Sequence, residues 1–128
     1  MFNDPLHFLF ATINNASTSN KSDINIPSSK KILKVLSFLY KQGLIRGYTQ
    51  NETRVNVYLK YTDSAVKPVI RHIQPISVKG RPFHANLKML EKLIHSNETF
   101  VISTSKGLLT LKDAIENQVG GFIFCKII

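Results

Sequence analysis

The spacing of apolar residues changes along the chain, and this change constrains the fold more than any other feature of the sequence. Before residue 40, apolar side chains twice recur every three or four positions, over residues 6–13 and 32–39. Over residues 55–61 they alternate with polar side chains, and the run Phe-Ile-Phe-Cys at 122–125 is wholly apolar. The first spacing is that of an amphipathic helix and the second that of a half-buried strand, while a short apolar run is typical of a buried strand. The sequence therefore predicts a mixed α/β (α+β) fold.

The predicted elements fall into two small lobes, an organisation that 128 residues can form. Residues 1–65 predict an N-terminal lobe of two helices on a small antiparallel sheet, with Gly43 ending the second helix. Residues 66–128 predict a mostly β C-terminal lobe with short helices that Asn86 and Thr110 cap. Its last strand should lie in the middle of the sheet because the strand is apolar on both faces.

The charge of the chain indicates a polyanionic partner. Seventeen Lys and Arg against eight Asp and Glu give a formal net charge of +9. Such a balance favours nucleic acid or an anionic membrane surface. The lysines are spread along the whole chain rather than gathered on one amphipathic helix, which favours nucleic acid. No apolar run approaches the length that spans a bilayer, so no membrane partner is expected.

The segment Ser-Thr-Ser-Lys-Gly at residues 103–107 carries the most specific chemistry. It follows an apolar strand-like run at 100–102 and precedes an apolar helix-like run. Ser103 and Lys106 match the S-x-x-K nucleophile motif, but its partner motifs Ser-Asp-Asn and Lys-Thr-Gly are missing. A phosphate-binding P-loop needs a glycine before its lysine, whereas Gly107 follows Lys106. The nucleophile motif is therefore a weak match, and the P-loop motif fails on spacing.

Two interpretations of residues 103–107 remain open on the residues alone. The hydroxyls, the backbone N–H groups freed by a turn at Gly107 and the charge of Lys106 suit a folded RNA strand with its 2′-OH groups. Alternatively, the segment is a tight strand-to-helix connection whose hydroxyls cap the local backbone.

Other catalytic or metal-binding sets are poorly supported. The four histidines and eight acidic residues form no short metal-ligand motif, and Cys125 is the single cysteine. We expect no catalysis, no cofactor, no metal and no small-molecule substrate.

Several segments, in order, resemble the bacterial-type small-subunit ribosomal protein S8 family. The resemblance covers nearly all of the chain and is carried by these segments: DPL (4–6), IPSSK (26–30), LYKQGLI (39–45), LKY (59–61), VISTSKGLLT (101–110) and VGGFIFC (119–125). The family implies a two-lobe α/β protein without catalysis or cofactor. It would bind the central domain of small-subunit ribosomal RNA, support assembly, and sit beside neighbouring small-subunit ribosomal proteins.

The resemblance also implies which residues contact RNA. The main contact falls on five residues: Ser103, Thr104, Ser105, Lys106 and Gly107. Gly120 and Gly121 would permit close backbone approach nearby. A second, phosphate-directed surface at a helix N-terminus comprises Ser28, Ser29, Lys30 and Lys31. A basic turn adds Lys79, Arg81 and His84, of which His84 could stack on a base.

This chain departs from the family pattern in the first helix and in the basic turn. Thr12 and Asn14 stand where the family has two arginines, so the first helix should hold RNA less firmly. His84 stands where the family usually has tyrosine. The functional alternatives are a general basic nucleic-acid-binding protein and an S-x-x-K acyl-transfer enzyme.

Amino acids encoded by AT-rich codons are abundant. Asn, Lys, Ile and Phe supply 45 of the 128 residues, and 13 lysines stand against 4 arginines. This composition indicates an AT-rich genome such as an organelle's own. We therefore expect an organelle-encoded protein of a mitochondrial ribosome, with a plastid or the bacterial cytoplasm as the alternative.

Overall fold

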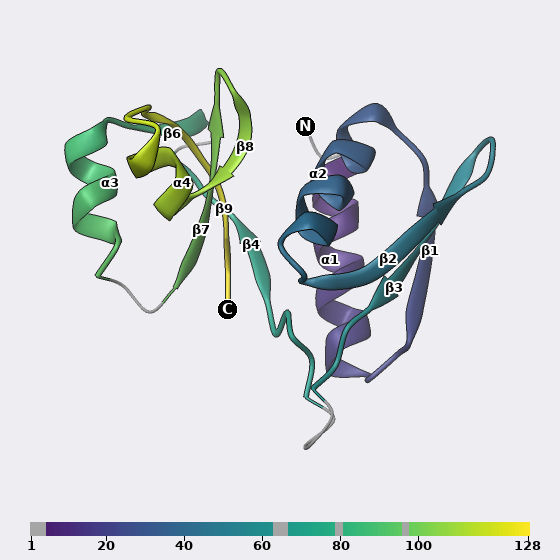
Figure 1. The fold of residues 1–128 in the computed structure, drawn as a ribbon. Coiled ribbons are helices and arrows are strands. Elements are labelled where there is room, and N and C mark those ends of the chain that lie inside the picture. The colour runs from purple at the N-terminus through teal and green to yellow at the C-terminus, as the bar shows by residue number, and fades with distance from the viewer. Residues whose placement is uncertain (1–4, 63–66, 79–80, 96–97) are drawn as a thin grey trace. The chain divides into compact units, whose positions relative to one another are not determined.

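The computed structural model describes residues 5–62, 67–78, 81–95 and 98–128, and these form two compact units (Figure 1). The units are Met1–His72 and Ile73–Ile128. The boundary predicted from the sequence, between residues 65 and 66, falls within the stretch 63–66, which lies outside the described residues. The α+β fold class is confirmed.

The first unit contains two helices and one three-stranded antiparallel sheet. The helices are α1 (Pro5–Thr18) and α2 (Lys30–Lys41), and the strands are β1 (Asp23–Pro27), β2 (Ile45–Gln50) and β3 (Arg54–Leu59). The strand order is β1-β3-β2, and Figure 1 shows both helices on one face of this sheet. The predicted arrangement of two helices on a small antiparallel sheet is therefore confirmed.

In the central strand of the first unit, every second side chain is apolar, and these are the side chains that are buried. In β3, Val55, Val57 and Leu59 are buried, whereas the alternating Asn56 and Tyr58 are half-buried. The apolar faces of the helices pack on this side through α1 and α2 residues that are almost fully buried: Leu9, Ile13, Ile32, Leu36 and Leu39. Burial of each such side chain contributes about 1.5–3 kcal/mol before entropy is counted.

Local chemistry ends α2 where the sequence predicts. Gly43 adopts φ 73°, and its N–H donates to Tyr40 O at 3.0 Å. The next N–H, of Leu44, donates to Leu39 O at 2.9 Å. This pair of bonds is a Schellman motif, which needs the left-handed conformation that glycine adopts without strain.

The second unit is mostly β, as predicted. Its strands are β4 (Ile73–Pro75), β5 (Ser77–Val78), β6 (Arg81–Ala85), β7 (Thr99–Thr104), β8 (Gly107–Thr110) and β9 (Gly121–Ile127). Its helices are α3 (Leu87–Leu93) and α4 (Leu111–Glu116). The strand order is β5-β6-β9-β7-β8, with β4 also paired to β9. The last strand therefore lies in mid-sheet, which confirms the prediction.

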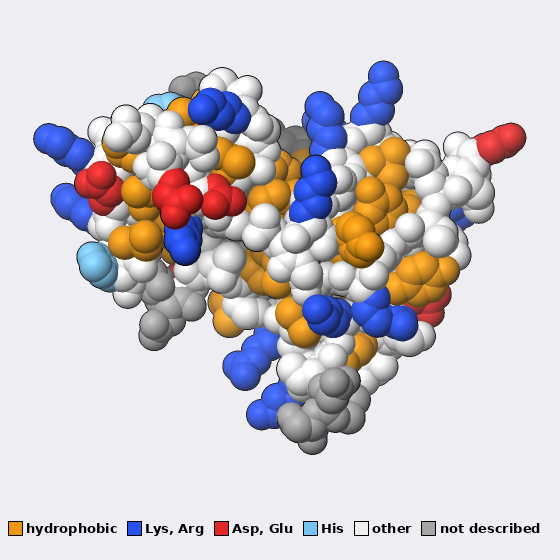
Figure 2. All heavy atoms as spheres, viewed as in Figure 1, with side chains coloured by type: hydrophobic (Ala, Val, Ile, Leu, Met, Phe, Trp, Pro, Cys, Tyr) orange, Lys and Arg blue, Asp and Glu red, His pale blue; other side chains and the backbone are white. Residues whose placement is uncertain are grey.

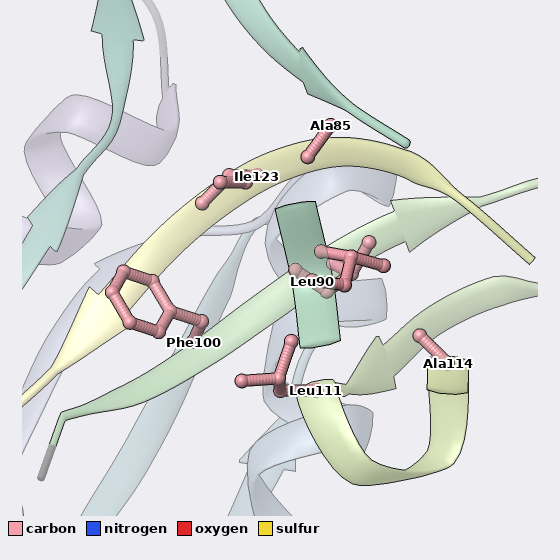
Figure 3. Close-up of a cluster of buried hydrophobic side chains, with 7 residues drawn as sticks. Ala85, Leu90, Phe100, Leu111, Ala114 and Ile123 are labelled. Atoms are coloured by element: carbon pink, nitrogen blue, oxygen red, sulfur yellow. The ribbon is translucent and has the colours of Figure 1, made fainter. Parts of the chain in front are cut away.

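One face of the second sheet carries the core. Figure 3 shows side chains from α3, α4 and the strands pointing toward one another in a single cluster, which comprises Ala85, Leu90, Phe100, Ile102, Leu111, Ala114 and Ile123. The predicted caps begin both helices: Asn86 Oδ1 accepts from Met89 N at 3.0 Å, and Thr110 Oγ1 accepts from Asp113 N at 3.1 Å. Leu90 of α3 and Leu111 and Ala114 of α4 pack both helices against this face.

The apolar run after Gly107 does not begin as a helix, contrary to the prediction. Residues 107–110 form β8, which pairs antiparallel with β7, and the helix begins only at Leu111. A segment as short as Gly-Leu-Leu-Thr, with two apolar side chains, fits a helix or a strand by spacing alone. Here the turn after Thr104 returns the chain onto β7, so the backbone groups of β8 find partners in that strand.

The core of the second unit gives a direct test of this packing. Leu90 is 0% exposed, and Leu90→Ala should lower the free energy of unfolding by about 2–5 kcal/mol, because it removes buried surface and leaves a cavity. Met89, the preceding residue of α3, is 37% exposed, so Met89→Ala should change the free energy of unfolding by less than about 1 kcal/mol. Urea unfolding followed by circular dichroism measures both, and equal effects would contradict the core assignment.

Candidate functional site

Residues 103–107 form a β-hairpin turn rather than a strand-to-helix loop. Ser103 and Thr104 end β7, Ser105 and Lys106 are the two turn residues, and Gly107 begins β8 opposite Thr104. The site is therefore presented at the end of two paired strands.

The hydroxyl of Thr104 closes this turn. It donates to Gly107 O at 2.9 Å and accepts from Lys106 N at 3.1 Å. Both bonds are local, so this hydroxyl serves the backbone of the turn, as the capping interpretation of the segment supposes.

The backbone conformation at position 107 requires glycine. Its φ is 100°, a value that L side chains rarely adopt, while a Cβ added there would meet nothing within 4 Å. Ser105 and Lys106 do not have positive φ, and a hairpin turn of that kind is commonly followed by one residue of positive φ, which glycine adopts without strain. The glycine therefore lets the chain reverse direction after the exposed pair Ser105 and Lys106.

Ser105 and Lys106 are the outward-facing groups of the turn. Both are exposed, and across the described ranges the Ser105 side chain has no hydrogen-bond partner. The Lys106 ammonium lies 3.5 Å from Asn117 Oδ1, at the outer limit of a hydrogen bond. One hydroxyl and one positive charge are thus accessible on a turn held by its own residues.

Gly120 and Gly121 are crowded by the protein's own backbone. A Cβ added at Gly120 would lie 2.8 Å from Ala85 O, and one added at Gly121 would collide with Ser103 O. The sequence assigned these glycines to close approach of RNA. In the structure, a residue without a side chain is needed at both positions because the start of β9 packs closely against residues of β6 and β7. An RNA contact at either glycine stays a prediction.

Three residues line up across the middle of the second sheet. Ser103 in β7 pairs with Phe122 in β9, and Phe122 pairs with His84 in β6. Directly paired residues of antiparallel strands share a face. The preceding pair, Ile102 with Ile123, belongs to the core, so these three, called here the Ser103 row, lie on the opposite face.

The ring of Phe122 is the feature that sequence reasoning missed. It is 44% exposed and meets the His84 ring edge-to-face, with centroids 5.2 Å apart and planes at 84°. The run Phe-Ile-Phe-Cys carries no polar residue to mark an outward face, so only pairing with the exposed His84 could have revealed it.

The other residues of the basic turn are described only in part. Arg81 lies in β6, where its backbone pairs with Val78 of β5. Lys79 lies outside the described residues. RNA contact at these two positions stays a prediction.

The second predicted surface lies at the start of α2, in the first unit. The Ser29 hydroxyl caps the helix by accepting from Ile32 N at 3.2 Å, and the Ser28 hydroxyl accepts from Gln50 Nε2 at 3.3 Å. Lys30 and Lys31 are exposed. Figure 2 shows further lysine and arginine side chains scattered over both units on the face in view.

The remaining titratable groups offer little reactive chemistry. Burial raises the pKa of the Cys125 thiol to about 12, so this thiol is neutral and unreactive near pH 7. Within the described ranges, no three His, Cys, Asp or Glu side chains gather as a metal site requires. Every helix described falls short of the length and apolar character needed to cross a membrane.

Comparison with known proteins gives one consistent family. The family model described as "Ribosomal protein S8" matches residues 4–128. The "Small ribosomal subunit protein uS8" of Brucella melitensis is 34% identical over 129 residues, which cover 97% of this chain and 96% of the relative. The proteins of that name from Brucella ovis and Brucella anthropi are 34% and 33% identical over the same coverage.

The role of Thr104 in closing the turn can be tested with an isosteric pair. Thr104→Val removes a hydroxyl that makes two bonds and should lower the free energy of unfolding by about 1–2 kcal/mol. Thr99→Val makes the same change at an exposed position of the same strand and should alter it by about 0.5 kcal/mol at most. Amide hydrogen exchange at Lys106 should also accelerate in Thr104→Val alone, because its N–H donates to the Thr104 hydroxyl. An unchanged exchange rate at Lys106 would show that this hydroxyl does not close the turn.

Proposed function

The chain belongs to the ribosomal protein S8 family, and from that premise we propose that it binds the central domain of small-subunit ribosomal RNA. Membership makes it a structural protein of the small ribosomal subunit with a role in translation. In the proposal, RNA and neighbouring small-subunit ribosomal proteins are its partners. The RNA contact is made chiefly by the second unit.

The observation that carries this proposal is the exposed pair at the β7–β8 turn. Ser105 offers a hydroxyl that both donates and accepts, and Lys106 offers a charge for a phosphate. A group that donates and accepts suits the 2′-OH of RNA, which does the same. Because Thr104 and Gly107 hold the turn, these groups are positioned before binding.

The proposal extends to further residues. Ser103 lies just before the turn, and His84 lies in the same Ser103 row two strands away, across Phe122. Gly120 and Gly121 let the backbone at the start of β9 pack closely against residues of β6 and β7. At the start of α2, the exposed Lys30 and Lys31 lie in the first turn, at the positive end of the helix dipole, and both the charge and the dipole favour a phosphate.

A general basic nucleic-acid-binding protein is the second candidate, and the net charge of +9 favours it. Such a protein would depend on total charge rather than on the position of a particular lysine. The acyl-transfer candidate receives no such support, because the family is structural, and Ser103 and Lys106 lie at a strand end and in a hairpin turn.

For the location, we propose a mitochondrial ribosome, with the bacterial cytoplasm as the alternative. The abundance of residues with AT-rich codons supports it. The compared relatives are bacterial and give the mitochondrial assignment no support, so it rests on composition alone.

The role of the β7–β8 turn in RNA binding can be tested with alanine variants of its two exposed residues and of a control lysine. In filter binding to a central-domain rRNA fragment, Ser105→Ala should weaken binding roughly threefold to tenfold, because one hydrogen bond is lost. Lys106→Ala should reduce the slope of log affinity against log salt by about one unit. Lys112, an exposed lysine of α4, is the control, and Lys112→Ala should leave affinity within about twofold.

Two outcomes would contradict the proposal in different ways. Unchanged affinity in both turn variants would remove the turn from the interface. Equal losses in Lys106→Ala and Lys112→Ala would favour the general basic protein, because each variant removes one positive charge.

The location is tested by mass spectrometry of small ribosomal subunits from purified mitochondria. Peptides of this chain should be enriched there in step with other small-subunit proteins. Recovery only from ribosomes outside the organelle would contradict the mitochondrial assignment.

A further inference from the structure

We propose that Phe122 stacks on one unpaired base of the bound RNA, with His84 as the positioning residue that holds its ring. This inference rests on the proposed function. It adds a contact residue that neither the motif nor the basic residues point to.

The exposure of Phe122 is unusual for its position. Among the described residues, the other large hydrophobic side chains that are exposed lie on helices, at a helix end or at the chain's last residue: Phe8, Tyr40, Met89, Ile94 and Ile128. Phe122 alone of this group lies in a strand, and that strand is paired on both sides. Its neighbours Gly121 and Ile123 are buried. Its ring also forms an edge-to-face pair with His84, so two aromatic rings stand together on the outward face of the sheet.

His84 leaves an aromatic face open. In an edge-to-face pair one ring presents its edge, so its partner can cover at most one face of the other ring. Each ring therefore keeps at least one face that the other does not cover. The contact also restricts rotation of Phe122, so little side-chain entropy remains to be lost when a base stacks on it.

The surroundings of Phe122 fit a base better than an apolar protein segment. Its cross-strand neighbour Ser103 is followed, two and three residues later, by the exposed hydroxyl of Ser105 and the charge of Lys106. Strands β6, β7 and β9 contain no Asp or Glu, so none of them places a carboxylate that would repel a phosphate backbone. An aromatic ring beside a serine, on a sheet whose neighbouring strand leads to a lysine, is a combination that suits an unstacked base of RNA, and every base has a π-face to offer.

The chain contains no tryptophan, so Phe122→Trp creates a single fluorescent reporter at this site. Titration of the full chain with the central-domain rRNA fragment should quench this fluorescence as the complex forms, since a base would stack on the indole. In filter binding, Phe122→Ala should lower affinity roughly 5- to 100-fold. The salt slope should not change, because no phosphate contact is removed.

Two controls separate stacking from folding and from general surface effects. Phe122→Leu keeps an apolar side chain but loses the flat ring, so it should lose affinity nearly as Phe122→Ala does while its urea unfolding stays close to wild type. Phe8→Ala removes a phenylalanine that is 52% exposed on α1 and should leave affinity unchanged. His84→Ala should weaken binding, and His84→Tyr should restore it if an aromatic edge is what positions Phe122.

The outcomes distinguish this inference from the proposed function. If Ser105→Ala weakens binding but Phe122→Ala and Phe122→Leu bind like wild type, the stacking role is overturned and the RNA interface stands. If Phe122→Ala impairs only the binding of another ribosomal protein, the surface belongs to a protein partner and the inference is likewise overturned. Failure of the wild-type chain to bind the fragment would overturn both.

Discussion

The second unit depends on the pairing of β9 with strands along both of its edges. It pairs with β7 on one side and with β6 and β4 on the other, so its residues set the register of the whole sheet. This register puts Ile102 and Ile123 in the core and Ser103 and Phe122 on the opposite face. A slip of one residue would exchange the two faces. The position of the hairpin turn relative to the exposed aromatic pair is therefore a consequence of strand pairing.

Much of the fold could be predicted because it is decided by local chemistry. Capping side chains at Ser29, Asn86 and Thr110 begin helices where they stand, and Gly43 ends one through a Schellman motif. These signals act over a few residues, so a sequence shows them directly. The strand β8 was missed because Gly-Leu-Leu-Thr is too short to distinguish a helix from a strand by spacing, and only its pairing with β7 decides between them.

The candidate site divides into residues that a sequence can identify and roles that it cannot. Residues 103–107 stand out as small, polar and basic, yet nothing in the sequence shows that the Thr104 hydroxyl is used by the turn while the Ser105 hydroxyl is exposed. The outward ring of Phe122 was missed for a related reason, since a wholly apolar run does not reveal its exposed side. In both cases the deciding information is which atoms lie across from a residue, and that depends on the fold.

The crowding at Gly121 bears on how genetic data for this protein should be read. Any side chain there would collide with Ser103 O, so a substitution displaces β9 and, with it, the strand that leads to the turn. In a deep mutational scan scored by ribosome function, variants at this position would group with those at the RNA-facing residues although no contact had been removed. Soluble yield measured for the same library would separate them, because a displaced central strand lowers yield and a lost surface hydroxyl does not.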